Sequence, residues 1–430
     1  MIELLRRNPA FLRLWLSQVV SQTGDWLNRM ACIVLIGQLG GSSAQLGLFF
    51  GVELALRLLP PAVLGPLAGP LADRYSRRAL MVLSDLGRAA VVLVFLFVDE
   101  PSELPLLYAL IYAQMAASVF FDTARAAALP DTVSRDELFD AHAYSAATWS
   151  VILSLGALAS GVLVALVGVR GAFVIDSASY VLSAALLWGM RLPGPARRTE
   201  PFRWREVLLF TELRRGWSHA RELGLGTALW AKTFWGGAGG FLVVLSLAGS
   251  VRFGERDTDA FATGALYSAR GVGTWFGPIL LRRFFGTDDR ALRRQISFGF
   301  VFAALGYAAF GFTESLELSC LAVAFAHFGG SSLWVASTIL WQRRVADSFR
   351  GRVFAVEYFG MCISFAVFGM LAGFVFDLSH SLAVTVWTMA GLVAALGGAW
   401  TWLARRLGSG PPAGRSPERA VGTTATAREG

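Results

Sequence analysis

The 430-residue chain has little charge for its length: 16% of its residues are Asp, Glu, Lys or Arg, whereas 55% are hydrophobic. A soluble domain carries about 25% charged residues, which cover a surface that faces water. The shortage therefore excludes an ordinary soluble globular protein. The net charge of +8 does not indicate nucleic-acid binding, because the charges fall mostly between long apolar segments.

Cysteine and histidine are also scarce. The three cysteines, Cys32, Cys320 and Cys362, lie inside apolar segments without any CxxC or Cys/His spacing, so we expect neither a disulfide framework nor a zinc site. None of the four histidines has HExxH or HxxxD spacing. This argues against a membrane-embedded enzyme, such as an acyltransferase or an intramembrane hydrolase. We expect no metal and no cofactor.

Apolar segments of about 20 residues recur along the chain, and each is long enough to cross the roughly 30 Å core of a bilayer. Lipid offers no hydrogen-bond partners to a backbone, so such segments must be helices. The sequence predicts an all-α integral membrane protein with twelve transmembrane helices in two six-helix halves. The predicted spans are 11–38, 44–66, 80–98, 104–126, 142–167 and 171–191, followed by 225–250, 260–281, 295–313, 317–342, 353–377 and 382–404.

A polar interval separates the two sets of spans. The predicted parts are an N-terminal half (1–191), a cytoplasmic basic linker (192–224), a C-terminal half (225–405) and a disordered cytoplasmic tail (406–430), whose residues are mostly small and polar. The first span lacks a small-residue cleavage site after a short apolar core, so we expect it to be retained and not removed as a signal peptide.

The arginines set the expected orientation, because short cytoplasmic loops retain positive charge. Alternate loops and the linker hold most of them, whereas the opposite loop at 99–103 is acidic. The linker arginines are Arg197, Arg198, Arg203, Arg205, Arg214, Arg215 and Arg221. We therefore expect a multi-pass protein of the inner cell membrane with both termini in the cytoplasm, as an even number of spans requires.

A glycine- and arginine-rich loop follows the second predicted span. It contains Gly69, Asp73, Arg74, Arg77 and Arg78. Glycine lets two backbones approach closely, and a carboxylate can accept hydrogen bonds from a helix N-terminus. The arginines could pair with Asp73 when the two halves close. The alternative is a plain positive loop without a gating role.

This loop, G-x-x-x-D-R-x-x-R-R, resembles the signature loop of the major facilitator superfamily, although Ser76 stands where the family usually has a second glycine. Other motifs resemble the macrolide-efflux and enterobactin-exporter branch of that superfamily, and the resemblance extends from residue 8 to about 405. These motifs include Asn8-Pro9, Gly24-Asp25, Arg125, Pro130 and Asp131, and, after the tenth span, Gln342, Arg343, Arg350, Gly351 and Arg352.

Two departures weaken the likeness to exporters. Export members often carry G-P-x-x-G-G in the fifth helix, whereas this chain has Gly156, Ala157 and Gly161 without the proline. Many drug exporters also have a central arginine in the fourth helix, where this chain has Gln114. A proton-relay arginine is therefore not expected in that helix.

Four charges in the first two spans are expected to serve transport. A charge at the bilayer centre costs roughly 2.5–3.5 kcal/mol, so each one needs a partner or water. Asp25 and Arg29 are four residues apart, as are Glu53 and Arg57, so each pair could bond within its helix. Counted from the intervening turn, Asp25 lies level with Arg57 and Arg29 with Glu53. The four could thus form one neutral, proton-handling cluster.

The second half carries three charges of its own. Lys232, the only lysine, could lose a proton where arginine could not, and Glu357 lies at a matching depth as its expected partner. Alternatively, Lys232 extends to the membrane interface. Arg270 has no assignable partner from sequence. We expect Asp176 to cap a helix start at the outer face and His327 to be a packed core residue.

The resemblance implies a secondary active transporter. We expect proton-coupled efflux of small amphipathic molecules such as drugs, siderophores or other secondary metabolites. An uptake permease or a lipid flippase of the same fold is the alternative. The expected partners are a small-molecule substrate, protons and the lipid bilayer, with no nucleic acid, and we expect the monomer to be functional.

Overall fold

The computed structural model describes residues 2–41, 43–192, 209–254 and 259–407, and this part of the chain is helical without β-strands. Residues 193–208 of the predicted linker, which include Arg197, Arg198, Arg203 and Arg205, and residues 408–430 of the predicted tail lie outside the described residues. The described end of the linker forms a helix, α8 (Leu209–Glu222).

The helices before α8 begin with the short α1 (Ile2–Arg7). They continue with α2 (Pro9–Gly40), α3 (Leu46–Arg74), α4 (Arg77–Val94), η1 (Phe95–Phe97), η2 (Pro101–Glu103), α5 (Leu104–Ala128), η3 (Leu129–Asp131), α6 (Leu138–Val151), the π-helical η4 (Ile152–Gly156) and α7 (Ala157–Trp188).

The helices after α8 follow in the same way. They are α9 (Gly226–Phe234), α10 (Gly236–Leu247), the π-helical η6 (Ala248–Arg252), α11 (Asp259–Phe285), α12 (Asp289–Phe310), α13 (Leu316–Gln342), α14 (Asp347–Ser379) and α15 (Leu382–Leu407).

Local sequence explains where several helices begin and break. Asn8 accepts a hydrogen bond from the backbone N–H of Phe11 at 3.0 Å and precedes Pro9, two common features of a helix start. Ser76 similarly caps α4. Within α7, Gly168 has φ of +73°, a conformation that glycine adopts without strain, and it breaks the helix between the predicted spans 142–167 and 171–191.

The described helices include eight stretches that are long and apolar enough to cross a membrane: Leu46–Arg74, Arg77–Phe97, Pro101–Asp131, Leu138–Trp188, Gly226–Arg252, Leu316–Gln342, Phe349–Ser379 and Leu382–Leu407. The 51-residue stretch Leu138–Trp188 covers two predicted spans. The predicted spans 11–38, 260–281 and 295–313 fall on the helices α2, α11 and α12. The chain is therefore an all-helical, multi-pass membrane protein.

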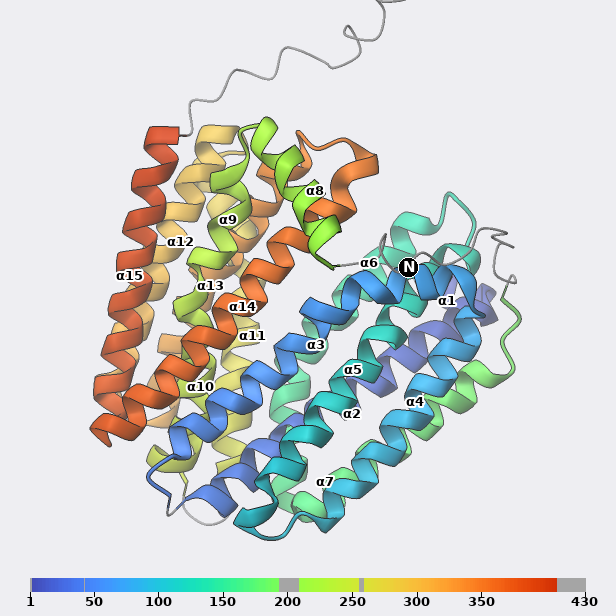
Figure 1. Ribbon diagram of the computed structural model, residues 1–430, viewed down its shortest axis with the longest axis horizontal. Coiled ribbons are helices and arrows are strands. Elements are labelled where there is room, and N and C mark those ends of the chain that lie inside the picture. The colour runs from blue at the N-terminus through green and yellow to red at the C-terminus, as the bar shows by residue number, and fades with distance from the viewer. Residues whose placement is uncertain (1, 42, 193–208, 255–258, 408–430) are drawn as a thin grey trace, which may run out of the picture.

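The helices pack into two groups, which lie side by side in Figure 1. The N-terminal bundle (α2–α7) is built around the packing of α2 on α7 and of α4 on α5, and the C-terminal bundle (α9–α15) around that of α13 on α11 and α12. The two bundles meet where α3 packs on α14 and α7 on α11. Residues from both bundles contribute to one large buried apolar core.

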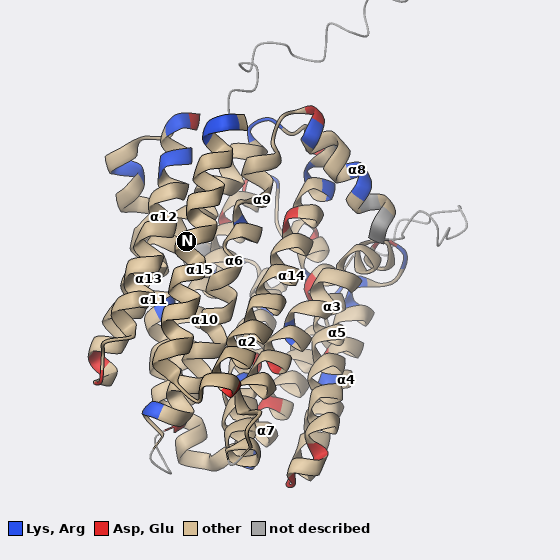
Figure 2. Cartoon of the chain, turned by 60° about the vertical axis from the view of Figure 1, so that its left-hand side comes forward, with Lys and Arg blue, Asp and Glu red and all other residues tan. Residues whose placement is uncertain are grey.

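The two ends of the bundles differ in charge. Figure 2 shows arginines gathered at the end that carries α8, which we call the basic end. The N-terminus and the end of α15 also lie there (Figure 1). At the opposite end, Arg170 pairs with Asp99 of the acidic loop at 2.7 Å.

Candidate functional site

A buried polar cluster joins three helices of the N-terminal bundle. Arg88 of α4 lies 3.4 Å from Asp25 of α2 (Nη1 to Oδ1), and the hydroxyl of Tyr180 in α7 donates to the same carboxylate oxygen. The Arg88 side chain is 1% exposed, whereas that of Asp25 is 29% exposed. Asp25 is thus less buried than the arginine that it contacts.

More polar groups surround Arg88. It forms an ion pair with Asp85 one turn away and donates to the hydroxyl of Ser21 at 3.0 Å. The Gln114 amide donates to Tyr180 at 2.8 Å. The guanidinium also lies 4.3 Å from the centre of the Tyr180 ring. The N-terminal bundle therefore does contain a buried arginine, Arg88. It comes from α4, and not from α5, where no central arginine was expected.

Asp176 belongs to the same region. It is fully buried in the middle of the stretch after Gly168, and a side chain at Gly24 of α2 would come within 2.4 Å of its carboxylate. The expectation that Asp176 caps a helix start is wrong, because the helix begins several residues earlier, at the break at Gly168. Asp25 and Asp85 thus contact one arginine, and Asp176 is buried close to Asp25 beside Gly24.

The structure does not hold the four predicted charges of the first two spans in one network. Glu53 and Arg57 form the expected ion pair within α3, and Arg57 also reaches the Asn28 side chain at 3.4 Å. Asp25 turns to α4 and α7, however, whereas Arg29 turns to Tyr267 of α11, 3.4 Å from its hydroxyl. The helix face that carries Asp25 and Arg29 borders several helices. Both side chains therefore bind to helices other than α3.

In the C-terminal bundle, Lys232 and Glu357 meet as expected. Their side chains are 2.9 Å apart and only 3% and 1% exposed. Lys232 also donates to Thr338 at 2.7 Å, and the indole of Trp341 donates to Glu357 at 3.1 Å. Lys232 therefore does not extend to an interface. The pair links α9 to α14 with most of its polar atoms satisfied.

Arg270 and His327 lie near one another but have different surroundings. His327 is buried, as expected of a core residue, and its Nε2 lies 3.1 Å from the hydroxyl of Tyr307. Arg270 interacts electrostatically with Arg29, Tyr267 and Tyr307. Within the described parts of the chain it forms no ion pair.

The first predicted motif loop makes its contacts at the basic end. Arg77 forms an ion pair with Asp131 of η3, which links the loop after α3 to the loop after α5. Arg78 donates to the backbone carbonyls of Trp188 and Met190 at 3.2 and 3.3 Å. Both arginines therefore bind within the N-terminal bundle.

The loops of the C-terminal bundle contain a similar link with the charges exchanged. Arg343 and Arg344, after α13, pair with Asp289 at the start of α12, and Arg350 pairs with Asp347 at 2.8 Å. The other motif residues lie at or near helix ends: Gly69, Asp73 and Arg74 near the end of α3, Arg125 near the end of α5, Pro130 in η3, Gln342 at the end of α13, and Gly351 and Arg352 near the start of α14.

The bundles pack most tightly at the end opposite the basic end. An added side chain at Gly373 of α14 would meet the backbone of Gly47 in α3 at 2.2 Å, which shows how closely these backbones approach. Asp377 also accepts hydrogen bonds from the backbone N–H groups of Gly47 and Leu48, at 2.7 and 2.8 Å. A carboxylate at a helix N-terminus is stabilised by the helix dipole as well.

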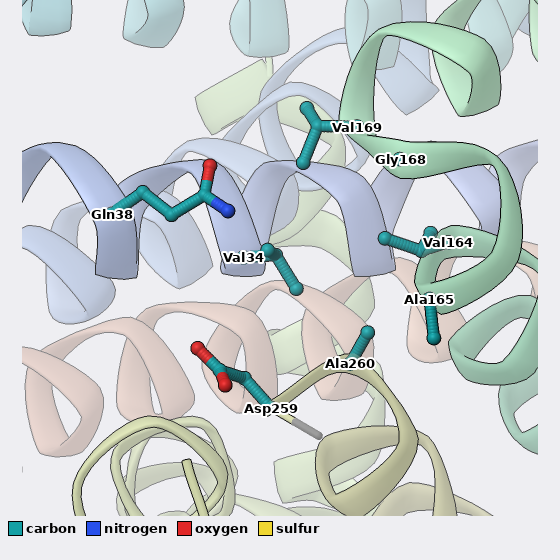
Figure 3. A pocket seen from close by; sticks show the side chains of 8 residues that line it. All are labelled: Val34, Gln38, Val164, Ala165, Gly168, Val169, Asp259 and Ala260. Carbon is teal, nitrogen blue, oxygen red and sulfur yellow. The ribbon is translucent and has the colours of Figure 1, made fainter. Parts of the chain in front are cut away.

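At the basic end the same helices diverge. A side chain added at Gly65 or Gly69 of α3, or at Gly351 of α14, would meet no atom within 4 Å. A small cavity of about 120 Å³ lies far from this end, between α2, α7 and α11. Figure 3 shows Gln38, Val164 and Asp259 among its lining residues. It is smaller than the roughly 300–1,000 Å³ of typical ligand sites, so we do not assign it a substrate.

Sequence reasoning missed Asp85, Arg88 and Tyr180. The first two carry the same signal that identified Asp25, a charge within an apolar span, and could have been found. No sequence signal distinguishes Tyr180 from other tyrosines, because its importance comes from where α7 packs.

Comparison with known proteins identifies relatives. The family model described as Major Facilitator Superfamily matches residues 14–288. YfiS of Bacillus subtilis, an uncharacterized MFS-type transporter, is 33% identical over 191 residues, which are 43% of each chain. The putative bacilysin exporter BacE of Bacillus subtilis is 25% identical over 342 residues, 79% of this chain and 83% of BacE.

Macrolide efflux protein A of Streptococcus pyogenes is 26% identical over 185 residues, 43% of this chain and 45% of the relative. The matches to YfiS and to macrolide efflux protein A thus span less than half of each relative. Among solved structures, a variant of the nucleoside transporter NupG has a TM-score of 0.68 at 11% identity, covering 93% of this chain and 99% of that one. The fold is therefore shared well beyond detectable sequence similarity.

Proposed function

Because the chain belongs to the Major Facilitator Superfamily, we propose that it is a proton-coupled exporter of small amphipathic molecules. Membership of this family indicates that the protein is a membrane transporter of a small molecule and not an enzyme. The observation that carries the proposal is the polar cluster of Asp25, Arg88 and Tyr180 inside the N-terminal bundle.

In this proposal the chain crosses the cell membrane twelve times. The bundles α2–α7 and α9–α15 are its two six-helix halves, with α6 to α7 counted as two spans that divide at Gly168. The basic end faces the cytoplasm, since loops with arginine are retained there. Both termini are then cytoplasmic, and one chain is the functional unit within the bilayer.

The packing of the two halves supports a state that is open to the cytoplasm. The outer ends are held together where α3 approaches α14 at Gly47 and Gly373. Near the basic end, Gly69 and Gly351 have no close neighbours. A transporter in this state is ready to accept its substrate from inside the cell. Rocking one half against the other would then expose the substrate to the outside.

The cluster around Arg88 supports proton coupling. Asp25 and Asp85 both contact Arg88, and the buried Asp176 lies beside Gly24, the chain neighbour of Asp25. In this proposal one of these carboxyl groups exchanges a proton during transport. We assign the exchange to Asp25, because it is 29% exposed whereas Asp85 is fully buried.

Asp25 interacts with Arg88 and Tyr180 differently in its ionised and its protonated form. When ionised, Asp25 accepts hydrogen bonds from both side chains, which stabilise its charge. When protonated, it loses most of the attraction to Arg88, so α2 is freed from α4. Coupling follows if the outward-open state favours the protonated form and the inward-open state the ionised form.

The test uses purified protein in proteoliposomes with an imposed pH gradient and two probes, radiolabelled erythromycin and the fluorescent compound dansyl-dialanine. We expect at least one probe to accumulate against its gradient only while the pH gradient lasts, and Asp25→Asn to allow only equilibration. Asp99→Asn, in an exposed loop, is the matched control. If neither probe responds to the pH gradient in the parent protein, the proposal is wrong.

The direction of substrate transport distinguishes an exporter from the alternative functions. Relatives named as an efflux protein and a putative exporter favour export. An uptake permease predicts accumulation in right-side-out vesicles, whereas an exporter predicts accumulation in inside-out vesicles. A lipid flippase predicts movement of a fluorescent phospholipid between leaflets without transport of either probe.

A further inference from the structure

Arg29 and Arg270 differ from three other cations in the membrane-embedded helices. Arg57, Arg88 and Lys232 each form an ion pair with a carboxylate. Arg29 and Arg270 form no such pair with any residue that the structure describes. A cation inside a membrane protein that lacks an acidic partner is expected to face water or a ligand.

These two arginines come from opposite bundles. Arg29 lies on α2 and Arg270 on α11, and these helices contact one another. Arg29 lies 3.4 Å from the hydroxyl of Tyr267, which precedes Arg270 by one turn of α11. Each side chain is partly exposed, unlike the buried Arg88 and Lys232. Two like charges therefore lie on neighbouring helices at the junction of the bundles, and neither residue is fully buried.

Aromatic groups surround Arg29. Its guanidinium lies 5.0 Å from the centre of the Tyr267 ring and 5.6 Å from that of Trp26, and it is 3.4 Å from the Tyr267 hydroxyl. Its Nε atom is buried and has no hydrogen-bond partner among the described residues. The contacts orient the guanidinium without neutralising it, which leaves donor capacity for another group.

We propose that Arg29 and Arg270 form an anion-binding subsite at the junction of the two bundles, which binds a carboxylate or phosphate group of an amphipathic substrate. Guanidinium groups bind such oxyanions through paired, charge-assisted hydrogen bonds. The rings of Trp26 and Tyr267 provide an apolar surface for the rest of the molecule. The bound anion also neutralises two charges that otherwise repel each other.

This inference rests on the proposed transport function and narrows its substrate class to organic anions. Binding between the bundles makes affinity depend on how they are arranged, since one arginine comes from each. Arg29 also lies one turn from Asp25, so the charge at the subsite and the proton on Asp25 affect each other through the field between them. An exporter of anions would in addition be favoured by a membrane potential that is negative inside.

The test measures binding and needs no transport. Dansyl-dialanine carries one carboxylate, and its C-terminal amide is the same molecule without the charge. Energy transfer from the tryptophans to the dansyl group reports binding to the purified full-length protein in lipid nanodiscs. We expect the acid to bind at least about tenfold more tightly than the amide, which corresponds to the difference of about 1.4 kcal/mol expected of a charge-assisted contact.

Substitutions then assign the preference to the two arginines. Arg29→Gln and Arg270→Gln should each bring the acid-to-amide ratio close to one, whereas Arg29→Lys should retain part of it. Arg170→Gln, which removes an exposed arginine at the outer end, should keep the parent ratio.

Two results would overturn the subsite. One is a parent protein that binds the acid and the amide equally, a comparison that depends on no variant being folded. The other is a pair of well-folded Gln variants that keep the parent preference. Failure of the proposed function is distinguishable, because loss of proton coupling in the transport assay would leave the acid-to-amide ratio unchanged.

Discussion

At the scale of single residues, Asp25 and Asp85 contact the same arginine but differ in access to solvent. Asp85 is completely buried beside Arg88, and Asp25 is the one that is partly exposed. A buried carboxylate that never meets water is suited to fixing the arginine in place. The exposed one is suited to exchanging protons. The two roles follow from burial and not from residue type.

Removing Arg88 should destabilise the protein strongly. Arg88→Gln leaves the carboxylates of Asp25 and Asp85 without their cation, and losing one partner of a buried ion pair typically costs about 3–5 kcal/mol. We expect the midpoint of thermal unfolding to fall clearly below that of the parent. Arg170→Gln, which breaks an exposed pair, should leave the midpoint close to that of the parent. Equal effects of the two substitutions would contradict the assignment.

The buried pair of Lys232 and Glu357 should behave differently when both partners are removed. Glu357→Ala should destabilise the protein by about 3–5 kcal/mol, because it leaves a buried ammonium unpaired. The double variant Lys232→Met, Glu357→Leu should regain most of that loss, since apolar residues of similar size can replace a buried ion pair. Thermal unfolding of the three proteins measures this. A double variant less stable than Glu357→Ala would show that the pair itself stabilises the fold.

Sequence reasoning reached part of this site and not the rest. The contact between Lys232 and Glu357 could be predicted, because two charges at matching depth in apolar helices have few other partners. The partners of Asp25 could not, since helix spacing places it near Arg29 and gives no information about α4 or α7. Which helices a buried charge meets depends on packing, and a single sequence does not specify it.

At the scale of the helices, α3 and α14 pack closely at the end opposite the basic end, which is the outer end in the proposed orientation. A leucine at Gly373 cannot fit, because even its Cβ would lie 2.2 Å from the backbone of Gly47. Gly373→Leu should therefore force the outer ends apart and reduce transport at least about tenfold, as expected when one of two alternating states is lost. Gly391→Leu, at a position without neighbours within 4 Å, is the matched control.

The opening can be measured directly. Spin labels at Ser43 and Ser381, in a background without the native cysteines, report the separation of the outer ends of α3 and α14. Gly373→Leu should shift the measured distances to longer values, and Gly391→Leu should not. An unchanged distance distribution in Gly373→Leu would show that these backbones do not set the closure.

The loop after α3 gives a second prediction at this scale. If Asp73 acts when the cytoplasmic ends close, Asp73→Asn should lower transport at least about tenfold, because the side chain keeps its shape but loses its negative charge. The protein should stay in the membrane at its normal level. Asp136→Asn, at an exposed loop position, should transport normally. Normal transport by a well-expressed Asp73→Asn protein would leave the loop with a topological role only.

Helix positions were more predictable than helix contacts. Each predicted span falls on a helix because the apolar length that crosses a bilayer also satisfies its own backbone. The break at Gly168 lies between two predicted spans, where a glycine could take a positive φ. The helix α8 within the predicted linker was not predicted. Its composition is mostly polar, so the face that packs on α14 is not evident from the sequence.

At the scale of the whole molecule, the two bundles are joined at one end and diverge at the other. Composition and apolar length do not determine this asymmetry, because a transporter must populate both arrangements with one sequence. The difference between them is small and can be shifted by a bound proton or substrate. Asp25 on α2 and Arg270 on α11 lie on helices that meet at the junction of the bundles, so both sites can act on the same equilibrium.

The central claim is that substrate binding exchanges with a proton on Asp25. The most direct test is to add dansyl-dialanine, or erythromycin if that probe is the one transported, to purified protein in weak buffer and to follow the pH with a soluble dye. The account predicts proton release by the parent and by Asp99→Asn, and none by Asp25→Asn, which should still bind the probe. Proton release by Asp25→Asn equal to that of the parent would contradict it and leave Asp25 with a structural role.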